Sequence, residues 1–196
     1  ARPDGWSWRT PLQNRLSYGY VFSSEHCSDG QARQVLMDCL QDKPLQEPRI
    51  IPFHNGMRSQ LWKRNCVAIG LAGGFLEPLE STAIHMAIRG VENFLELFPN
   101  LDDDTHEWPA LAAEFNRRLR LEYEEIRDFI ILHYCTSKRS DSEFWRRCQS
   151  RPLPDSLAAR IELFRARAEL RAADGSLFGR SDWLAVLTGM GVIPAA

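Results

Sequence analysis

Residues 73–82, GGFLEPLEST, join an apolar segment to the beginning of an apolar pattern with helical spacing. Glu77 and Glu80 lie three positions apart around Pro78, and two glycines precede them. Two carboxylates and two hydroxyls at such a junction need a physical explanation, because carboxylates are uncommon next to the buried ends of apolar elements.

A helix that begins within residues 79–81 explains this composition. The first turn of a helix carries backbone N–H groups without partners inside the helix. Together with the positive end of the helix dipole and the hydroxyls of Ser81 and Thr82, these donors would form an anion site beside Glu80. Gly73 and Gly74 would let a flat ligand approach the backbone. The alternative is an ordinary helix N-terminus after a tight turn.

Before this junction the pattern favours strands and turns. Rough alternation in residues 6–12 (WSWRTPL) and 15–24 (RLSYGYVFSS) predicts two neighbouring strands. Ser28 can cap a helix of about 15 residues. Residues 65–74, NCVAIGLAGG, predict a buried strand that runs into a glycine-rich turn.

After the junction the pattern is helical. Apolar residues recur at i, i+3 and i+4 from Leu79 until Pro99-Asn100, and a long helix is predicted over 109–134. Further helices are predicted around FWRRC, from Asp155 or Ser156 to about 172, and in SDWLAVL. The fold class is therefore α+β and helix-rich, with a small β layer in residues 1–78 and a helical region in 79–196.

Composition narrows the range of functions. The chain has 196 residues with 44% apolar content and a formal net charge of −2, which is typical of a globular protein. This charge gives no reason to expect nucleic acid or an anionic membrane as a partner. No apolar run reaches the roughly 18–20 residues that cross a bilayer.

Cysteine and histidine usage points away from disulfide and metal frameworks. The five cysteines are odd in number and form no C-x-x-C pair, so we expect a reducing, cytoplasmic compartment and no zinc site. Four of the histidines are too dispersed for a ligand set and are expected to be surface or structural residues: His26, His54, His85 and His106.

Three segments resemble the tryptophan halogenase family of flavin-dependent halogenases. Residues 65–85, NCVAIGLAGGFLEPLESTAIH, resemble the segment between flavin and substrate. GWSWRTP resembles the W-x-W-x-I-P signature, with Trp6, Trp8 and Pro11 matching and Thr10 in place of isoleucine. DFIILHYCTSKRSDSEFWRRC resembles the substrate-binding helix and its following loop.

The resemblance implies a fold and an activity. The β layer would be the end of a flavin-monooxygenase-like domain, and the helices would form a substrate region. Reduced FAD from a separate flavin reductase, oxygen, and chloride or bromide would yield hypohalous acid. That oxidant would halogenate an electron-rich aromatic substrate.

The resemblance also implies roles for individual residues. Glu80 would be the catalytic carboxylate, and the backbone N–H groups of Thr82 and Ala83 would hold the halide. Leu71 and Ile84 would pack near the flavin ring. The wall between flavin and substrate would contain Trp6, Trp8 and Pro11. Without the resemblance, the two tryptophans would be assigned to the core of a strand pair.

Two expected features are absent from these 196 residues. No G-x-G-x-x-G follows a first strand, and G-L-A-G-G-F has the wrong spacing to hold the FAD pyrophosphate. The family's essential lysine has no match either, since Lys43, Lys63 and Lys138 lie in none of its motifs. We therefore expect an N-terminal FAD-binding region of the same protein as a partner, and an inactive chain without it.

The substrate positions depart from those of enzymes that act on free tryptophan. Those enzymes grip the amino acid with two tyrosines and a glutamate, where this chain has His133, Tyr134 and Ser140. Loss of the acid should weaken the binding of an ammonium group strongly, and Asp141 would replace it only if the loop shifts by one residue. Phe144 and Trp145 would still stack on an aromatic ring. An indole-type substrate is expected rather than free tryptophan.

Two alternatives remain at this stage. The first is a flavin-dependent monooxygenase, whose product would be oxygenated. The second is a non-catalytic helical module that keeps the fold and works through binding. Hydrolase and metalloenzyme motifs such as G-x-S-x-G and H-E-x-x-H do not occur in the chain.

Overall fold

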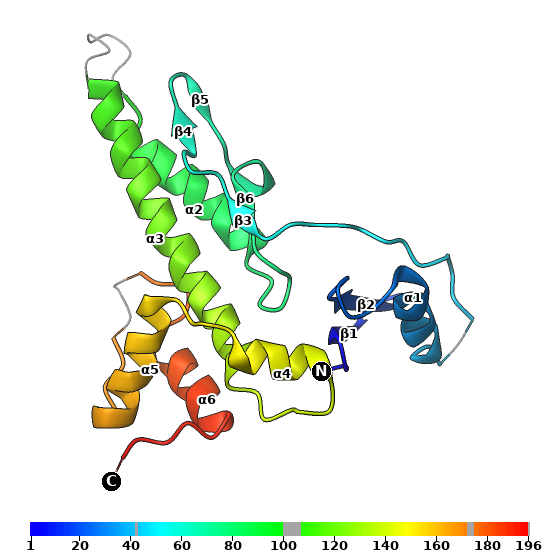
Figure 1. Ribbon diagram of the computed structural model, residues 1–196. Coiled ribbons are helices and arrows are strands. Elements are labelled where there is room, and N and C mark those ends of the chain that lie inside the picture. The colour runs from blue at the N-terminus through cyan, green and yellow to red at the C-terminus, as the bar shows by residue number, and fades with distance from the viewer. Residues whose placement is uncertain (42, 100–106, 172–174, 196) are drawn as a thin grey trace. The chain divides into compact units, whose positions relative to one another are not determined.

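The computed structural model describes residues 1–41, 43–99, 107–171 and 175–195 (Figure 1). Helices dominate the described chain: α1 (Asp29–Asp38), α2 (Ala83–Glu96), α3 (Trp108–Cys135), α4 (Glu143–Ser150), α5 (Asp155–Arg167) and α6 (Arg180–Gly189). The helix-rich character predicted from the sequence is confirmed.

The strands do not form one layer. β1 (Gly5–Pro11) pairs antiparallel with β2 (Leu16–Phe22), as the alternation predicted. The other strands are two residues long and form two separate pairs: β3 (Gly56–Met57) with β6 (Gly74–Phe75), and β4 (Trp62–Lys63) with β5 (Cys66–Val67). Of the buried strand predicted to run into a glycine-rich turn over 65–74, only Cys66–Val67 is a strand, and it is not buried, whereas the turn is present. A single 3-10 turn, η1 (Gly70–Ala72), follows this strand, with Gly70 at φ +60°.

The chain divides into two compact units. Unit 1 contains residues 1–53 and 134–152, and unit 2 contains residues 54–133 and 153–196. The end of α3 and all of α4 thus belong to the same unit as the N-terminal strands.

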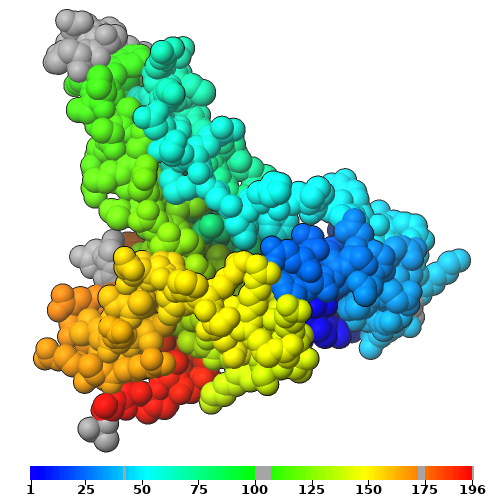
Figure 2. All heavy atoms as spheres, viewed as in Figure 1, coloured from blue at the N-terminus to red at the C-terminus, as the bar shows by residue number. Residues whose placement is uncertain are grey.

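In unit 1, α4 is attached to the N-terminal segment. The indole N–H of Trp145 donates to the Arg2 carbonyl at 2.8 Å, and the Ser142 hydroxyl donates to the Pro3 carbonyl at 2.5 Å. Figure 2 shows atoms of α4, in yellow, against those of the N-terminal residues, in blue. The helix α1 begins at the expected cap, where Ser28 forms a reciprocal capping box with Gln31. It ends at Asp38, earlier than predicted.

In unit 2, α3 is the central helix. Its buried residues Phe115, Leu119, Ile126 and Phe129 recur on one stripe, and this apolar face explains why it forms. Phe129 stacks on Phe178 with ring centroids 3.9 Å apart. The Phe129 ring also meets Trp183 of α6 edge to face at 5.0 Å, and Arg160 of α5 pairs with Glu125 of α3 at 3.3 Å, so both helices are attached to α3.

Two helix boundaries differ from the prediction. The helix α2 begins at Ala83, after the expected residues 79–81, and ends at Glu96, before the Pro99-Asn100 pair that was expected to end it. The helix α5 ends at Arg167, well before residue 172, because Ala168 adopts a left-handed conformation with φ +54°.

Candidate functional site

The junction before α2 has an unusual backbone. Thr82 is the N-cap of α2, is 4% exposed, and accepts no side-chain capping bond from the first turn. Ser81, directly before it, has φ +55°, a left-handed conformation that is costly for a residue with a β-carbon. The strained turn brings Glu80 beside a helix start whose first N–H groups lack intrahelical acceptors.

His133 of α3 holds Glu80. The imidazole Nε2 lies 3.1 Å from Glu80 Oε1, and Nδ1 lies 2.9 Å from the carbonyl oxygen of Phe129. The His133 side chain is 13% exposed and the Glu80 side chain 29% exposed. The carboxylate thus has one oxygen in a partly buried ion pair, and its orientation is fixed by α3.

The pKa of His133 is raised above its ordinary value. Burial acts to lower this pKa, but three interactions together outweigh it: the hydrogen bond to Glu80, the bond to the Phe129 carbonyl, and the charges of Glu80 and Glu77. The imidazole therefore keeps its positive charge to higher pH than a free histidine.

The two glycines of the junction have a different role from the one expected. A β-carbon on Gly74 would lie 2.7 Å from the Gly56 carbonyl oxygen, and one on Gly73 would lie 2.8 Å from a Leu61 methyl. The space beside both glycines is filled by the protein itself. The expectation that they leave room for a flat ligand is therefore wrong.

The two residues expected near a flavin ring lie on the surface of unit 2. Leu71 is 73% exposed and Ile84 is 75% exposed. They belong to η1 and α2, which pack against each other. Ile84 also begins an exposed apolar stripe along α2, which continues with Ile88, Val91, Leu95 and Phe98. Exposed apolar patches of this kind mark interaction or ligand-binding surfaces.

Trp6 of the expected wall and the aromatic residues of the expected substrate site form one cluster in unit 1. Trp145 is fully buried, contacts Trp6 edge to face at 5.4 Å, and lies nearly parallel to Tyr134 at 5.8 Å. Phe144 meets Trp145 edge to face at 5.1 Å, so a ring between these two requires them to separate. The Trp6 indole nitrogen is buried and has no hydrogen-bond partner among the described residues.

Trp8 and Pro11 lie further along β1. Trp8 pairs with Gly19 of β2, where its ring covers the glycine, and Pro11 pairs with Leu16 at the end of the ladder. Trp6 and Trp8 are two positions apart on a strand and so share one face of it. Of the three wall residues, only Trp6 has ring contacts with the cluster among the described interactions.

The loop after α3 leaves no unpaired acid at the substrate positions. Arg139 donates to both oxygens of Asp141, at 2.9 and 2.6 Å, which lowers the pKa of Asp141. The same guanidinium lies 5.4 Å from the centroid of the Trp145 ring. Arg146 donates to the carbonyl of Ser140 at 2.7 Å. The negative charge of Asp141 is thus already paired with the positive charge of Arg139.

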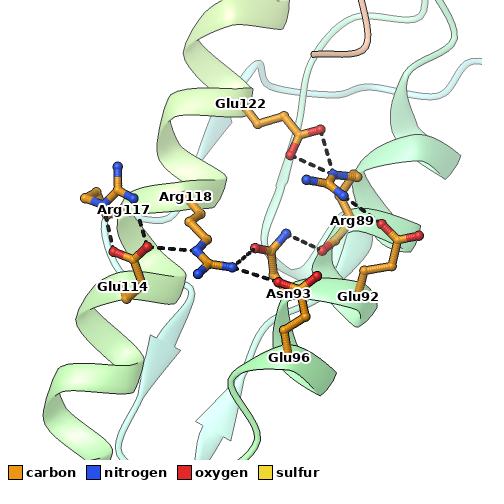
Figure 3. Close-up of polar contacts among 8 residues, drawn as sticks. All are labelled: Arg89, Glu92, Asn93, Glu96, Glu114, Arg117, Arg118 and Glu122. Carbon is orange, nitrogen blue, oxygen red and sulfur yellow. Dashed lines mark hydrogen bonds and ion pairs between the residues drawn. The ribbon is translucent and has the colours of Figure 1, made fainter. Parts of the chain in front are cut away.

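An ion-pair network between α2 and α3 was not anticipated. Glu122 accepts from Arg89 through both oxygens at 3.2 Å and contacts His85 Nε2 at 2.6 Å. Figure 3 shows Arg118 continuing the network toward Asn93. Its signal in the sequence is the spacing of charged residues by three and four positions along both helices. A solvent-exposed helix face shows the same spacing, so the network cannot be identified from the sequence alone.

Within the described residues, no group of three or more histidine, cysteine or acidic side chains is placed to hold a metal ion. The described helices also include none that is long and apolar enough to cross a membrane.

Solved structures with the same fold are halogenases. The chain is 45% identical to BrvH, a flavin-dependent halogenase from Brevundimonas sp. BAL3, with a TM-score of 0.92 over 100% of this chain and 39% of that one. It is 44% identical to Xcc4156, a flavin-dependent halogenase from Xanthomonas campestris, also with a TM-score of 0.92, over 99% of this chain and 38% of that one.

The family assignment extends over the whole sequence. The family model for tryptophan halogenase matches residues 1–196, and the chain belongs to this family. A curated relative, tryptophan 7-halogenase KtzQ from Kutzneria sp. (strain 744), is 33% identical over 99% of this chain and 39% of its own length. The chain thus spans 31–39% of the length of the curated relatives that it matches.

Proposed function

We propose that this chain forms the halide and substrate side of a flavin-dependent halogenase that acts on an electron-rich aromatic compound. The observation that carries the proposal is the Glu80 carboxylate, fixed by His133 at the beginning of α2. A positioned carboxylate beside unsatisfied N–H donors suits a reaction that handles both an anion and a proton.

The flavin would rest on the exposed apolar surface of Leu71 and Ile84. Bound there, reduced FAD would supply, with oxygen, the oxidising equivalents that convert halide to hypohalous acid. The groups that hold the FAD pyrophosphate, and the lysine that receives the oxidant, would come from a part of the protein outside residues 1–196. A separate flavin reductase would deliver the reduced flavin.

Chloride or bromide would bind at the N-terminus of α2. The N–H groups of Thr82 and Ala83 lie at the start of the helix. A halide needs only such donors and the positive end of the helix dipole. Alanine at position 83 is compatible with this role because the donor is the backbone.

Glu80 would remove the proton that an aromatic carbon loses when it gains the halogen. The C–H bond breaks, its electron pair returns to the ring, and the proton goes to the carboxylate oxygen that His133 does not hold. This step needs a carboxylate held in position, which the contact with His133 provides.

The substrate would be an indole or a similar ring rather than free tryptophan. The polar groups at the corresponding positions already have partners: His133 is bound by Glu80, the Ser140 carbonyl by Arg146, and Asp141 by Arg139. A free ammonium group would find no unpaired carboxylate among them. The aromatic surface of Tyr134, Phe144 and Trp145 would bind the ring.

The test uses the protein as its gene encodes it, with the intact mass recorded first. It is supplied with a flavin reductase, NADH, FAD and bromide, and then offered either indole or L-tryptophan, with BrvH as the reference enzyme. Mass spectrometry should detect a brominated indole that the Glu80→Gln variant does not form.

The other outcomes separate the alternatives. A hydroxylated product would indicate a flavin-dependent monooxygenase. A protein of only 22.5 kDa that binds no flavin and forms no product would contradict catalysis and leave a binding module. Faster turnover of tryptophan than of indole would contradict the proposed substrate class.

A further inference from the structure

The hydrogen bonds of His133 fix the location of one proton. The Phe129 carbonyl oxygen can only accept, so the His133 Nδ1 at 2.9 Å from it must carry a hydrogen. The other ring nitrogen, Nε2, faces Glu80 Oε1 at 3.1 Å. A carboxylate oxygen and an unprotonated nitrogen would repel each other, so this contact also needs one hydrogen.

The pair therefore holds a single shared proton. It exists either as imidazolium and carboxylate or as neutral imidazole and carboxylic acid, and both forms have the same net charge. Glu77 is the further charged group that acts on the imidazole, and it favours the imidazolium form. The aromatic neighbour on the same helix, the Phe129 ring at 5.0 Å, adds no charge.

We propose that His133 is a positioning residue for Glu80 and does not bind the substrate. It holds Oε1 through the shared proton and leaves Oε2 as the oxygen that would face the reacting ring. This inference rests on the proposed halogenase function and reassigns a residue that sequence comparison places among the substrate ligands.

Two substitutions test the roles of the two ring nitrogens separately. His133→Gln keeps a donor that can reach Glu80 but lacks the group that bonds to the Phe129 carbonyl. His133→Asn keeps a donor for Phe129 but is too short to reach Glu80. Both variants are neutral and polar, so they form a matched pair.

The kinetic test uses the gene product under the indole assay described above. We expect kcat to fall about 10- to 100-fold in His133→Asn, the range expected for loss of a charged hydrogen bond, with the KM for indole within about twofold of the original. His133→Gln should retain most of kcat but lose any limb of the pH profile that reports the imidazole. A raised KM with unchanged kcat in both variants would instead make His133 a substrate ligand and overturn the proposal.

A second measurement does not depend on activity. In the 196-residue chain, the ring nitrogens of His133 can be followed by ¹⁵N NMR between pH 5 and 9 and assigned through the His133→Asn variant. We expect Nδ1 to stay protonated and the titration midpoint to drop in Glu80→Gln. A midpoint that Glu80→Gln leaves unchanged would refute the shared proton, even if the protein proved not to be a halogenase.

Discussion

Asn116 of α3 hydrogen-bonds both backbone groups of Trp62, as a neighbouring strand would. Its side-chain oxygen accepts from the Trp62 N–H at 2.8 Å, and its side-chain nitrogen donates to the Trp62 carbonyl at 2.9 Å. The same oxygen also accepts from the Leu61 N–H at 2.6 Å. One amide thus satisfies a strand edge that would otherwise be buried without partners.

Replacement of Asn116 should therefore destabilise unit 2. Asn116→Ala leaves three backbone groups without their partner, and we expect a loss of about 2–4 kcal/mol in the free energy of unfolding. Urea denaturation of the chain measures it. Gln60→Ala, at an exposed neighbouring position, should change the value by less than about 0.5 kcal/mol. Equal effects of both substitutions would show that the Asn116 bonds contribute little.

The α2–α3 network should depend on Glu122 more than on Glu114. Glu122 is 13% exposed and joins His85 and Arg89, so Glu122→Gln should cost about 2 kcal/mol of unfolding free energy. Glu114 pairs with Arg117 and Arg118 on the solvent side, and these arginines lower its pKa to about 2. Because surface pairs contribute little, Glu114→Gln should leave the thermal midpoint unchanged. The idea fails if Glu114→Gln proves the more destabilising of the two.

Glycine at position 74 should be essential for the β3–β6 pair. The nearest atoms to an added β-carbon belong to the backbone of Gly56 and Met57, at 2.7 and 2.9 Å, and cannot move aside as a side chain can. Gly74→Ala is expected to lose about 1–3 kcal/mol. Gly189→Ala has nothing within 4 Å of the new carbon and should be neutral or slightly stabilising. Calorimetry of both variants decides the matter.

The left-handed conformation of Ser81 should cost stability. Ser81→Gly removes the β-carbon at φ +55° and should raise the unfolding free energy by about 1 kcal/mol. Ser81→Ala removes only the hydroxyl and keeps the strain, so it serves as the control. If Ser81→Gly is less stable than Ser81→Ala, the backbone at this residue is not strained.

The Glu80–His133 pair predicts how stability depends on pH. Burial opposes the charge of His133, but its bonds to Glu80 and Phe129 raise its pKa above the unfolded value of about 6.5. A raised folded pKa gives stability that is fully present below the unfolded pKa and is lost as pH rises through the folded pKa. Urea denaturation from pH 5 to 9 should show this loss in the original chain and a flatter curve in Glu80→Gln. Parallel stability curves for the original chain and Glu80→Gln would show that the Glu80–His133 pair does not contribute to the pH dependence.

The sequence predicted those elements whose signals are local. The ends of α3 lie within one residue of the prediction, because its apolar stripe is long and Pro109 stands at its start. The Ser28 cap and the β1–β2 pair were also predicted, since capping chemistry and alternation each act over a few residues. In the run CVAIG the strand is shorter than predicted, because an apolar run does not reveal that the expected turn already begins at Gly70.

The candidate site was predictable only in part. Glu80 and the start of α2 could be located from the junction motif, although the left-handed Ser81 delays the helix to Ala83. The contact of Glu80 with His133 could not be predicted, because the two residues are distant in sequence and meet only through the packing of α3. The same holds for Asn116 and Trp62. The Asn116 side chain takes the place of a neighbouring strand, and nothing in the sequence indicates that such a strand is missing.

The Arg139–Asp141 pair sets a limit on redesign of the loop after α3. Adding an acid at position 140 to recruit an amino-acid substrate would place it next to Arg139 and near Arg146, and either guanidinium could capture it. A glutamate there would then form another internal ion pair instead of binding an ammonium group. If the substrate is the indole-type ring proposed above, a change to free tryptophan would require removal of an arginine together with introduction of the acid. Neither substitution alone would then improve the binding of tryptophan.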